Sequence, residues 1–215
     1  MIVNERIVDY ICSLEKSNSK ICEEIEEYAI ATHVPIIRKE MESFLRVMLT
    51  IKKPKRILEV GSGIGYSAVL MSEYISADSR IDTIENYKKR IPLVKENIKK
   101  AAKENVIKLY EGDATDILKE LKGPYDFIFM DAAKAQYINF LPDILRLLSP
   151  NGVLISDNVL QEGSIIDSKF VIERRDRTIH KRMRDYLYEL KHNDKLETTI
   201  VPIGDGITMS VKIGD

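Results

Sequence analysis

The spacing of hydrophobic residues divides the chain into two parts. In the first part, residues 1–52, apolar residues recur three or four positions apart, as in Ile7, Ile11 and Leu14, which is the period of an amphipathic helix. Pro35 interrupts this pattern, so we expect more than one helix in this N-terminal extension. In the second part, short apolar runs alternate with amphipathic stretches, a pattern typical of βα units and a parallel sheet.

Five apolar runs in the second part predict strands, and the stretches between them predict helices. The expected strands cover residues 56–60, 81–84, 106–110, 126–130 and 152–156. The expected helices lie near residues 66–77, 87–103, 114–122, 135–147 and 170–191. Residues 198–202 and 207–213, joined by Gly204-Asp205-Gly206, predict a final antiparallel hairpin, because an Asp-Gly turn accepts positive φ. Since the sequence has no internal repeat and no long linker, we expect one α/β domain over residues 1–215.

The composition is that of an ordinary globular protein, with 44% hydrophobic and 31% charged residues among 215. A formal net charge of −1 gives no overall attraction to a polyanion, although a local basic face stays open. Cys12 and Cys22 are too few for a disulfide framework or a zinc cluster. The sequence has neither a signal-like start nor an apolar stretch of about 20 residues, so we expect a cytoplasmic protein with no membrane segment.

A glycine-rich loop follows the first predicted strand. Gly61, Gly63 and Gly65 lie where this strand meets the next helix, so backbone N–H groups and a helix N-terminus face the sheet edge. Dinucleotide sites with the G-x-G-x-x-G fingerprint have a third glycine where this chain has Tyr66. The loop therefore predicts a polar or anionic ligand and disfavours a nicotinamide nucleotide. Taken alone, it is also consistent with a tight turn that holds no ligand.

Two acidic residues follow the next two predicted strands. Glu85 comes about 20 positions after the loop, where a carboxylate accepts the ribose hydroxyls of a nucleotide. Asp113 follows the third strand, within reach of an adenine amino group. Each has a plainer alternative, a solvated strand end for Glu85 and a helix N-cap for Asp113. Because the carboxyl ends of parallel strands share one sheet edge, the acids and the loop together indicate a nucleoside-bearing ligand.

Polar side chains also end the fourth and fifth predicted strands. Asp131, Asp157 and Asn158 offer hard oxygen atoms, and so few protein ligands leave positions for water and substrate, which favours Mg²⁺ over a closed calcium or zinc site. The alternative is that these residues are helix caps and turn residues. Lys134 lies three positions after Asp131, where a bound cation would disfavour its ammonium form, so it is a candidate general base. The alternative is a solvated surface residue, as most lysines are.

These motifs together resemble the cation-dependent class I O-methyltransferases, the group of catechol and caffeoyl-CoA O-methyltransferases. The resemblance covers residues 25–212 and is strongest in Leu58-Glu59-Val60-Gly61, Gly65-Tyr66-Ser67, Gly112-Asp113-Ala114, residues 131–137 and Asp157-Asn158-Val159-Leu160. It implies a Rossmann-like class I methyltransferase fold with a seven-stranded, mostly parallel sheet and a C-terminal antiparallel hairpin. It also implies the cofactors S-adenosyl-L-methionine and Mg²⁺.

The resemblance assigns roles to individual positions of this sequence. The implied metal ligands are Asp131, Asp157 and Asn158, and the implied catalytic residues are Lys134, as general base, and Asp131. The implied cofactor-binding residues are Ile37, Glu59, Gly61, Gly63, Gly65, Ser67, Glu85, Asp113, Ala114, Asp131 and Tyr137. Members of this family are often dimers, so we also expect a homodimer.

Within the group, the chain more closely resembles the bacterial tRNA 5-hydroxyuridine methyltransferases, which form 5-methoxyuridine at the wobble position. This resemblance lies in Tyr28-Ala29, residues 33–36, Asp157-Asn158-Val159-Leu160 with Gly163, the arginine-rich stretch after it, and Ile203-Gly204-Asp205-Gly206. We therefore expect the anticodon arm of a tRNA as partner. Basic residues at 3-4-3 spacing along the predicted helix 170–191 are candidates for phosphate contacts. The candidate RNA-binding residues are Arg174, Arg175, Arg177, Lys181 and Arg184. The alternative is a solvated helix face whose charge is balanced by Glu173, Asp176 and Asp185.

Three other functions stay open at this point. The same chemistry applies to a small catechol or a hydroxycinnamoyl ester, because each presents two adjacent oxygen atoms to the metal. The glycine loop and Glu85 are also found in nicotinamide-dependent oxidoreductases. A non-catalytic RNA-binding module would retain the basic helix and make no use of Asp131.

Overall fold

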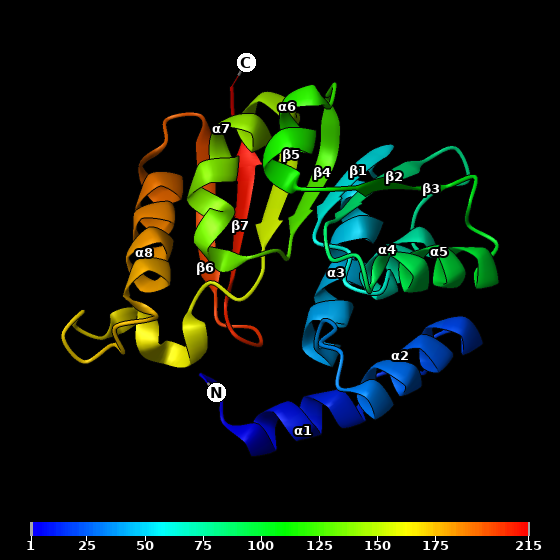
Figure 1. Ribbon diagram of the computed structural model, residues 1–215, viewed down its shortest axis with the longest axis horizontal. Coiled ribbons are helices and arrows are strands. Elements are labelled where there is room, and N and C mark those ends of the chain that lie inside the picture. Colours follow the sequence, from blue (N-terminus) through cyan, green and yellow to red (C-terminus); the bar gives the residue numbers. More distant parts are fainter. Residues whose placement is uncertain (1, 215) are drawn as a thin grey trace.

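The computed structural model describes residues 2–214, and its centre is a twisted seven-stranded sheet (Figure 1). The strands lie in the order β3-β2-β1-β4-β5-β7-β6. Their bounds are β1 Arg56–Val60, β2 Arg80–Glu85, β3 Ile107–Glu111, β4 Tyr125–Met130, β5 Leu148–Ser156, β6 Leu196–Val201 and β7 Ile207–Lys212. Strands β1 to β5 pair in parallel, and β7 runs antiparallel to both of its neighbours. The predicted fold class and the final hairpin are therefore confirmed.

Eight α-helices and two short 3₁₀ helices surround this sheet in the described residues. The α-helices are α1 Glu5–Ser13, α2 Lys20–Thr32, α3 Lys39–Lys52, α4 Tyr66–Ser72, α5 Ile91–Lys100, α6 Ala114–Glu120, α7 Tyr137–Leu147 and α8 Arg177–His192. The 3₁₀ helices are η1 Lys134–Gln136 and η2 Gln161–Ile166. The predicted N-terminal extension is thus three helices. Met1 and Asp215, the ends of the predicted domain, lie outside the described residues.

The sheet is buried on both faces because its central strands are apolar at nearly every position. In β4, Phe127 and Phe129 pack into a core that includes residues of α2 to α5. Ile128 and Met130, which alternate with them, pack into a second core with residues of α6, α7 and α8. None of the described helices is long and apolar enough to cross a membrane.

The predicted helix over residues 170–191 is wrong in its first part, because α8 begins only at Arg177. Phe170 and Val171 are 79% and 75% exposed, so residues before Arg177 bury no apolar face that would stabilise a helix. Arg174 and Arg175 consequently precede the helix. The predicted stripe of basic residues on one helical face is therefore wrong for Arg174, whereas Arg177, Lys181 and Arg184 keep their 4-3 spacing within α8.

Candidate functional site

A cavity of about 570 Å³ opens at the carboxyl ends of the parallel strands. It lies where the strand order reverses, between β1 and β4, which is the place where open α/β sheets bind ligands. The loops after β1, β2, β3, β4 and β5 all contribute to its walls. The residues predicted to bind a ligand and lining this cavity are Ile37, Gly61, Gly63, Ser67, Glu85, Asp113, Ala114, Asp131, Lys134, Asp157 and Asn158.

The glycine loop is packed tightly against the end of β4. Gly61 has a φ of +99°, and a Cβ atom built on it would lie 2.1 Å from the carbonyl oxygen of Asp131. Any side chain at this position would therefore force the two strand ends apart. The loop is also tied to β2, because the N–H groups of Gly61 and Ser62 donate to the carbonyl of Ile84 at 3.1 and 3.0 Å. Because the glycine loop packs so closely against the end of β4, it leaves space for the cavity that it lines.

The two acids behind the loop both reach the cavity. Glu85 is only 7% exposed, and its carboxylate accepts hydrogen bonds from the N–H groups of Gly63 and Tyr87, both at 2.8 Å. The alternative of a solvated strand end is therefore wrong for Glu85. Asp113 accepts a hydrogen bond from the N–H of Thr115 at 2.8 Å, which caps α6 and lowers the pKa of the Asp113 carboxyl. The helix cap is thus present, and the same residue borders the cavity.

Asp131, Asp157 and Asn158 come together at the ends of β4 and β5. Burial raises the pKa values of both carboxyls above their ordinary range, and the charge of Asp131 raises that of Asp157 further. One oxygen of Asp157 accepts the N–H of Asn158 at 2.7 Å, whereas no described residue donates a hydrogen bond to the Asp131 carboxylate. The buried carboxylate of Asp157, the partly buried carboxylate of Asp131 and the amide of Asn158 are a donor set that fits a hard divalent cation.

Lys134 lines the same cavity, and its charge acts on both Asp131 and Asp157. Its Nζ is 3.5 Å from Oδ2 of Asp205, whose side chain is 6% exposed. The other oxygen of Asp205 accepts the N–H of Glu162, and both residues line the cavity. Asp205 is a site residue that the sequence reasoning missed, because the acid between two glycines was assigned to the hairpin turn. The positive φ values fall on Gly204 and Gly206 instead.

Three predicted cofactor residues do not line the cavity but lie directly behind its wall. Glu59 is fully buried and accepts hydrogen bonds from Ser67 and Thr83, and burial raises the pKa of Glu59 to about 7. The hydroxyl of Tyr137 lies 3.0 and 3.1 Å from the carbonyl oxygens of Met130 and Asp157. Gly65 precedes α4 with a φ of +85°. These residues support the strand ends that carry the cavity walls.

The candidate RNA-binding residues lie outside the cavity, and most have partners within the chain. Arg175 pairs with Glu173 at 3.0 Å, and Lys181 pairs with Asp185 at 2.5 Å. Arg177 donates to the carbonyl of Ile172 at 3.0 Å, and Arg184 donates to that of Ile165 at 3.4 Å. No described residue forms a hydrogen bond or ion pair with the side chain of Arg174. The acidic residues Glu173 and Asp185 therefore balance part of the basic charge.

The predicted cofactor residue Ile37 belongs to a segment that lines the cavity along its whole length. Residues 35–38, which we call the roof segment, all line it. The carbonyl oxygen of Pro35 lies 3.8 Å from where a Cβ of Gly63 would be, and Cδ of Arg38 lies 3.6 Å from the corresponding point at Gly204. The roof segment therefore extends from the glycine loop to the connection between β6 and β7.

Comparison with known proteins identifies the family. A family model described as O-methyltransferase matches residues 13–213. The chain belongs to the O-methyltransferase family. The family resemblance inferred from the motifs is thereby confirmed, and the nicotinamide-dependent alternative is excluded.

Individual relatives of this O-methyltransferase carry more specific names. Catechol O-methyltransferase of Niastella koreensis is 33% identical over 128 residues, which are 58% of each chain. Caffeoyl-CoA O-methyltransferase 2 of Populus trichocarpa is 31% identical over 184 residues, covering 79% of this chain and 72% of that protein. The SAH-bound crystal structure of Podospora anserina methyltransferase PaMTH1 has a TM-score of 0.86 and 28% identity, covering 98% of this chain and 95% of that one.

Proposed function

We propose that this O-methyltransferase transfers the methyl group of S-adenosyl-L-methionine to a hydroxyl that has a second oxygen beside it, with Mg²⁺ in the site. One observation carries the proposal. A single cavity is lined both by the acids expected to hold a nucleoside, Glu85 and Asp113, and by the oxygen donors Asp131, Asp157 and Asn158. A methyl donor at the glycine loop would therefore face a substrate beside the acidic cluster. The SAH-bound state of a relative with the same fold supports this choice of cofactor.

The cofactor would be held mainly by the loop and by Glu85. Glu85 is already fixed by the N–H groups of Gly63 and Tyr87, so its carboxylate needs little reorganisation to accept ribose hydroxyls. Ser67, Ile37, Asp113 and Ala114 all line the cavity, and we assign the first two to the methionine part and the last two to adenine. In-line transfer requires close alignment of the sulfonium and the attacking oxygen, which a cavity with fixed walls provides.

The metal would be held by Asp131, Asp157 and Asn158. When bound, Mg²⁺ would supply a Lewis acid that favours ionisation of the substrate hydroxyl. Lys134 lines the same cavity, and in its neutral form, which a neighbouring cation would favour, its Nζ could accept the proton of that hydroxyl. In the ammonium form, Asp205 holds this side chain at the cavity wall through the ion pair at 3.5 Å.

For the substrate we propose 5-hydroxyuridine at the wobble position of a tRNA, which presents a 5-hydroxyl next to a 4-carbonyl. Two features support it besides the similarity of motifs. Arg38 is exposed at the cavity mouth, and no described residue forms a hydrogen bond or ion pair with its guanidinium, so it is free to contact a phosphate. Arg174 is also exposed and has no hydrogen-bond or ion-pair partner among the described residues, so it too could contact a phosphate. The names of the relatives favour a second candidate, a catechol or hydroxycinnamoyl ester.

A competition of substrates tests this proposal. The protein is incubated with methyl-labelled S-adenosylmethionine, Mg²⁺ and either hydroxyuridine-containing tRNA or a catechol. We expect label in the tRNA, recovered as 5-methoxyuridine by mass spectrometry of its nucleosides. Label in the catechol alone would contradict the tRNA substrate but retain the methyl transfer. Label in neither, with no binding of the cofactor, would contradict the proposed activity itself.

The affinity for Mg²⁺ is expected to depend on pH. Because burial raises the pKa values of Asp131 and Asp157, metal binding must displace protons when the pH falls to these raised values. The affinity for Mg²⁺ is therefore highest at pH values well above these pKa values. It decreases toward mildly acidic pH, by about tenfold per pH unit for each proton displaced. Calorimetry between pH 8 and pH 6 in buffers of different ionisation heat measures both quantities. A pH-independent affinity with no proton release would contradict the assignment of these ligands.

We also propose a homodimer in which a second copy of the chain covers α1. None of the residues of α1 is buried, and Tyr10 and Leu14 are 65% and 66% exposed. Ile7 and Ile11 extend the same apolar surface. Light scattering of the purified chain measures the molar mass, and a monomer over the full concentration range would contradict the proposal.

A further inference from the structure

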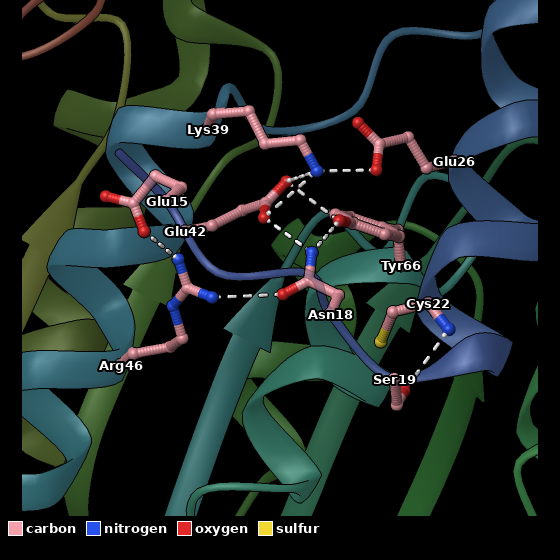
Figure 2. Close-up of polar contacts among 9 residues, drawn as sticks. All are labelled: Glu15, Asn18, Ser19, Cys22, Glu26, Lys39, Glu42, Arg46 and Tyr66. Carbon is pink, nitrogen blue, oxygen red and sulfur yellow. Dashed lines mark hydrogen bonds and ion pairs between the residues drawn. The ribbon is translucent and has the colours of Figure 1, made fainter. Parts of the chain in front are cut away.

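Tyr66 occupies an unexpected position in the glycine loop. It is the first residue of α4, directly after Gly65, and it lines the cavity although it is 1% exposed. In Figure 2 its hydroxyl is directed into a group of polar side chains from the N-terminal helices. Burial, together with the hydrogen bond to Glu42, raises the pKa of Tyr66 well above its ordinary value, so the hydroxyl is a donor. Tyr66 thus connects the loop to a different part of the chain.

Glu42 of α3 is the acceptor at the centre of this group. Its side chain is 1% exposed, and one carboxylate oxygen accepts the Tyr66 hydroxyl at 2.7 Å. The other oxygen accepts Nδ2 of Asn18 at 2.8 Å, and that same nitrogen lies 3.1 Å from the Tyr66 hydroxyl. Nζ of Lys39 completes the shell at 3.4 Å. With these donors the hydrogen-bonding capacity of the buried carboxylate is filled. Removal of one donor would leave a buried charge without a partner, which costs free energy.

An outer ring of contacts fixes the donors in turn (Figure 2). Lys39 pairs with Glu26 of α2 at 2.5 Å. Arg46 of α3 pairs with Glu15 at 2.5 Å, and its second nitrogen donates to Oδ1 of Asn18 at 3.1 Å. The network therefore joins α2, α3 and the segment between α1 and α2 to one hydroxyl at the start of α4.

The C-terminal end of the roof segment adjoins this network. Residues 35–38 directly precede Lys39, so the ion pairs of Lys39 with Glu26 and Glu42 hold the end of the roof segment. The other partner of Glu42 is Tyr66, which belongs to the floor of the cavity. The buried carboxylate of Glu42 therefore contacts both the residue that follows the roof segment and the residue that follows the glycine loop.

We propose that Glu42 and Tyr66 are positioning residues that hold the roof segment over the glycine loop and thereby set the affinity for the methyl donor. The inference rests on the proposed function, because it takes the cavity between roof and loop as the cofactor site. According to this proposal, the packing of the N-terminal helices against α4 affects cofactor binding. Linkage then requires the reverse effect, so that cofactor binding also tightens the docking of these helices.

The principal test is the variant Tyr66→Phe, which keeps the ring and removes the hydroxyl. Loss of a hydrogen bond to a buried carboxylate is expected to raise the dissociation constant for S-adenosylhomocysteine by about tenfold. Turnover at saturating cofactor stays close to that of the unchanged chain, since the reacting groups are untouched. Calorimetry and steady-state kinetics measure the two quantities separately.

Tyr125→Phe is the matched control. The Tyr125 hydroxyl is 2.6 Å from Oδ2 of Asp82, a tyrosine–carboxylate contact of the same kind that does not line the cavity. Tyr125 is also 1% exposed, so a comparable loss of thermal stability is expected. Its affinity for S-adenosylhomocysteine is expected to stay unchanged. Equal affinities in both variants would overturn the inference and leave the proposed function intact.

Amide hydrogen exchange supplies a second measurement. The protection that S-adenosylhomocysteine gives to the roof segment should not change if the network only stabilises the fold. In the unchanged chain, S-adenosylhomocysteine is expected to slow amide exchange in residues 35–45, and Glu42→Gln or Tyr66→Phe is expected to reduce this protection. If Glu42→Gln fails to fold, Tyr66→Phe still decides the question. Protection that persists undiminished in Tyr66→Phe would contradict the role of the network. Absence of binding in the unchanged chain would overturn the proposed function together with the inference.

Discussion

Replacement of Asp157 by alanine is expected to lower metal-dependent turnover by about a thousandfold, because Lewis-acid stabilisation of the transition state is worth several kcal/mol. Affinity for S-adenosylhomocysteine is expected to change little, since the glycine loop, Glu85 and Asp113 are retained. Steady-state kinetics over a range of Mg²⁺ concentrations, with calorimetry of cofactor binding, measures both effects. Activity of the unchanged chain should be lost in the presence of a chelator and recover when Mg²⁺ is added.

The control for this variant is Asp116→Ala, which removes a carboxylate that is 81% exposed on α6. It is expected to leave turnover unchanged. Unfolding of the metal-free chain separates loss of function from loss of structure. Because burial raises the pKa of Asp157, its charge destabilises the metal-free fold above that pKa, so Asp157→Ala should unfold at no lower temperature at pH 8. Full activity of Asp157→Ala in chelator would contradict the metal site.

The features that the sequence predicted well depend on short stretches of chain. Strands β4 and β5 each have an apolar run at or near their carboxyl ends, residues 127–130 and 153–155, and the acids Asp131 and Asp157 follow the ends of these strands. Parallel pairing then brings these ends to one edge without further information. For this reason the predicted residues at the ends of β1, β2, β3, β4 and β5 line a common cavity.

The features that were missed depend on contacts between distant parts of the chain. Lys134 and Asp205 are 71 positions apart, and Glu42 and Tyr66 are 24 apart, so no local period relates them. A turn motif explained Asp205 adequately, and no sequence motif marked Glu42. The helix predicted from residue 170 failed for a related reason, since its apolar positions Phe170 and Val171 have no surface to pack against. Tertiary burial, which the sequence does not display, decided these cases.

Replacement of Lys134 by methionine is expected to lower turnover by about a hundredfold or more, the usual loss when a positioned general base is removed. Methionine keeps the length of the side chain and removes the nitrogen that lies 3.5 Å from Asp205. Binding of Mg²⁺ and of S-adenosylhomocysteine is expected to persist, because Lys134 is a ligand of neither. Single-turnover kinetics with bound cofactor measures the transfer step directly.

Lys134→Arg distinguishes proton acceptance from positive charge at this position. A guanidinium keeps the charge opposite Asp205 but does not give up its proton in proteins, so a general base predicts the same loss as in Lys134→Met. Lys119→Met is the control, since Lys119 lies on the exposed side of α6 and pairs with Asp116 at 3.8 Å. Retained activity in Lys134→Arg would mean that the charge alone matters. In that case ionisation of the substrate hydroxyl would depend on the metal site and solvent, and Lys134 would only orient the substrate.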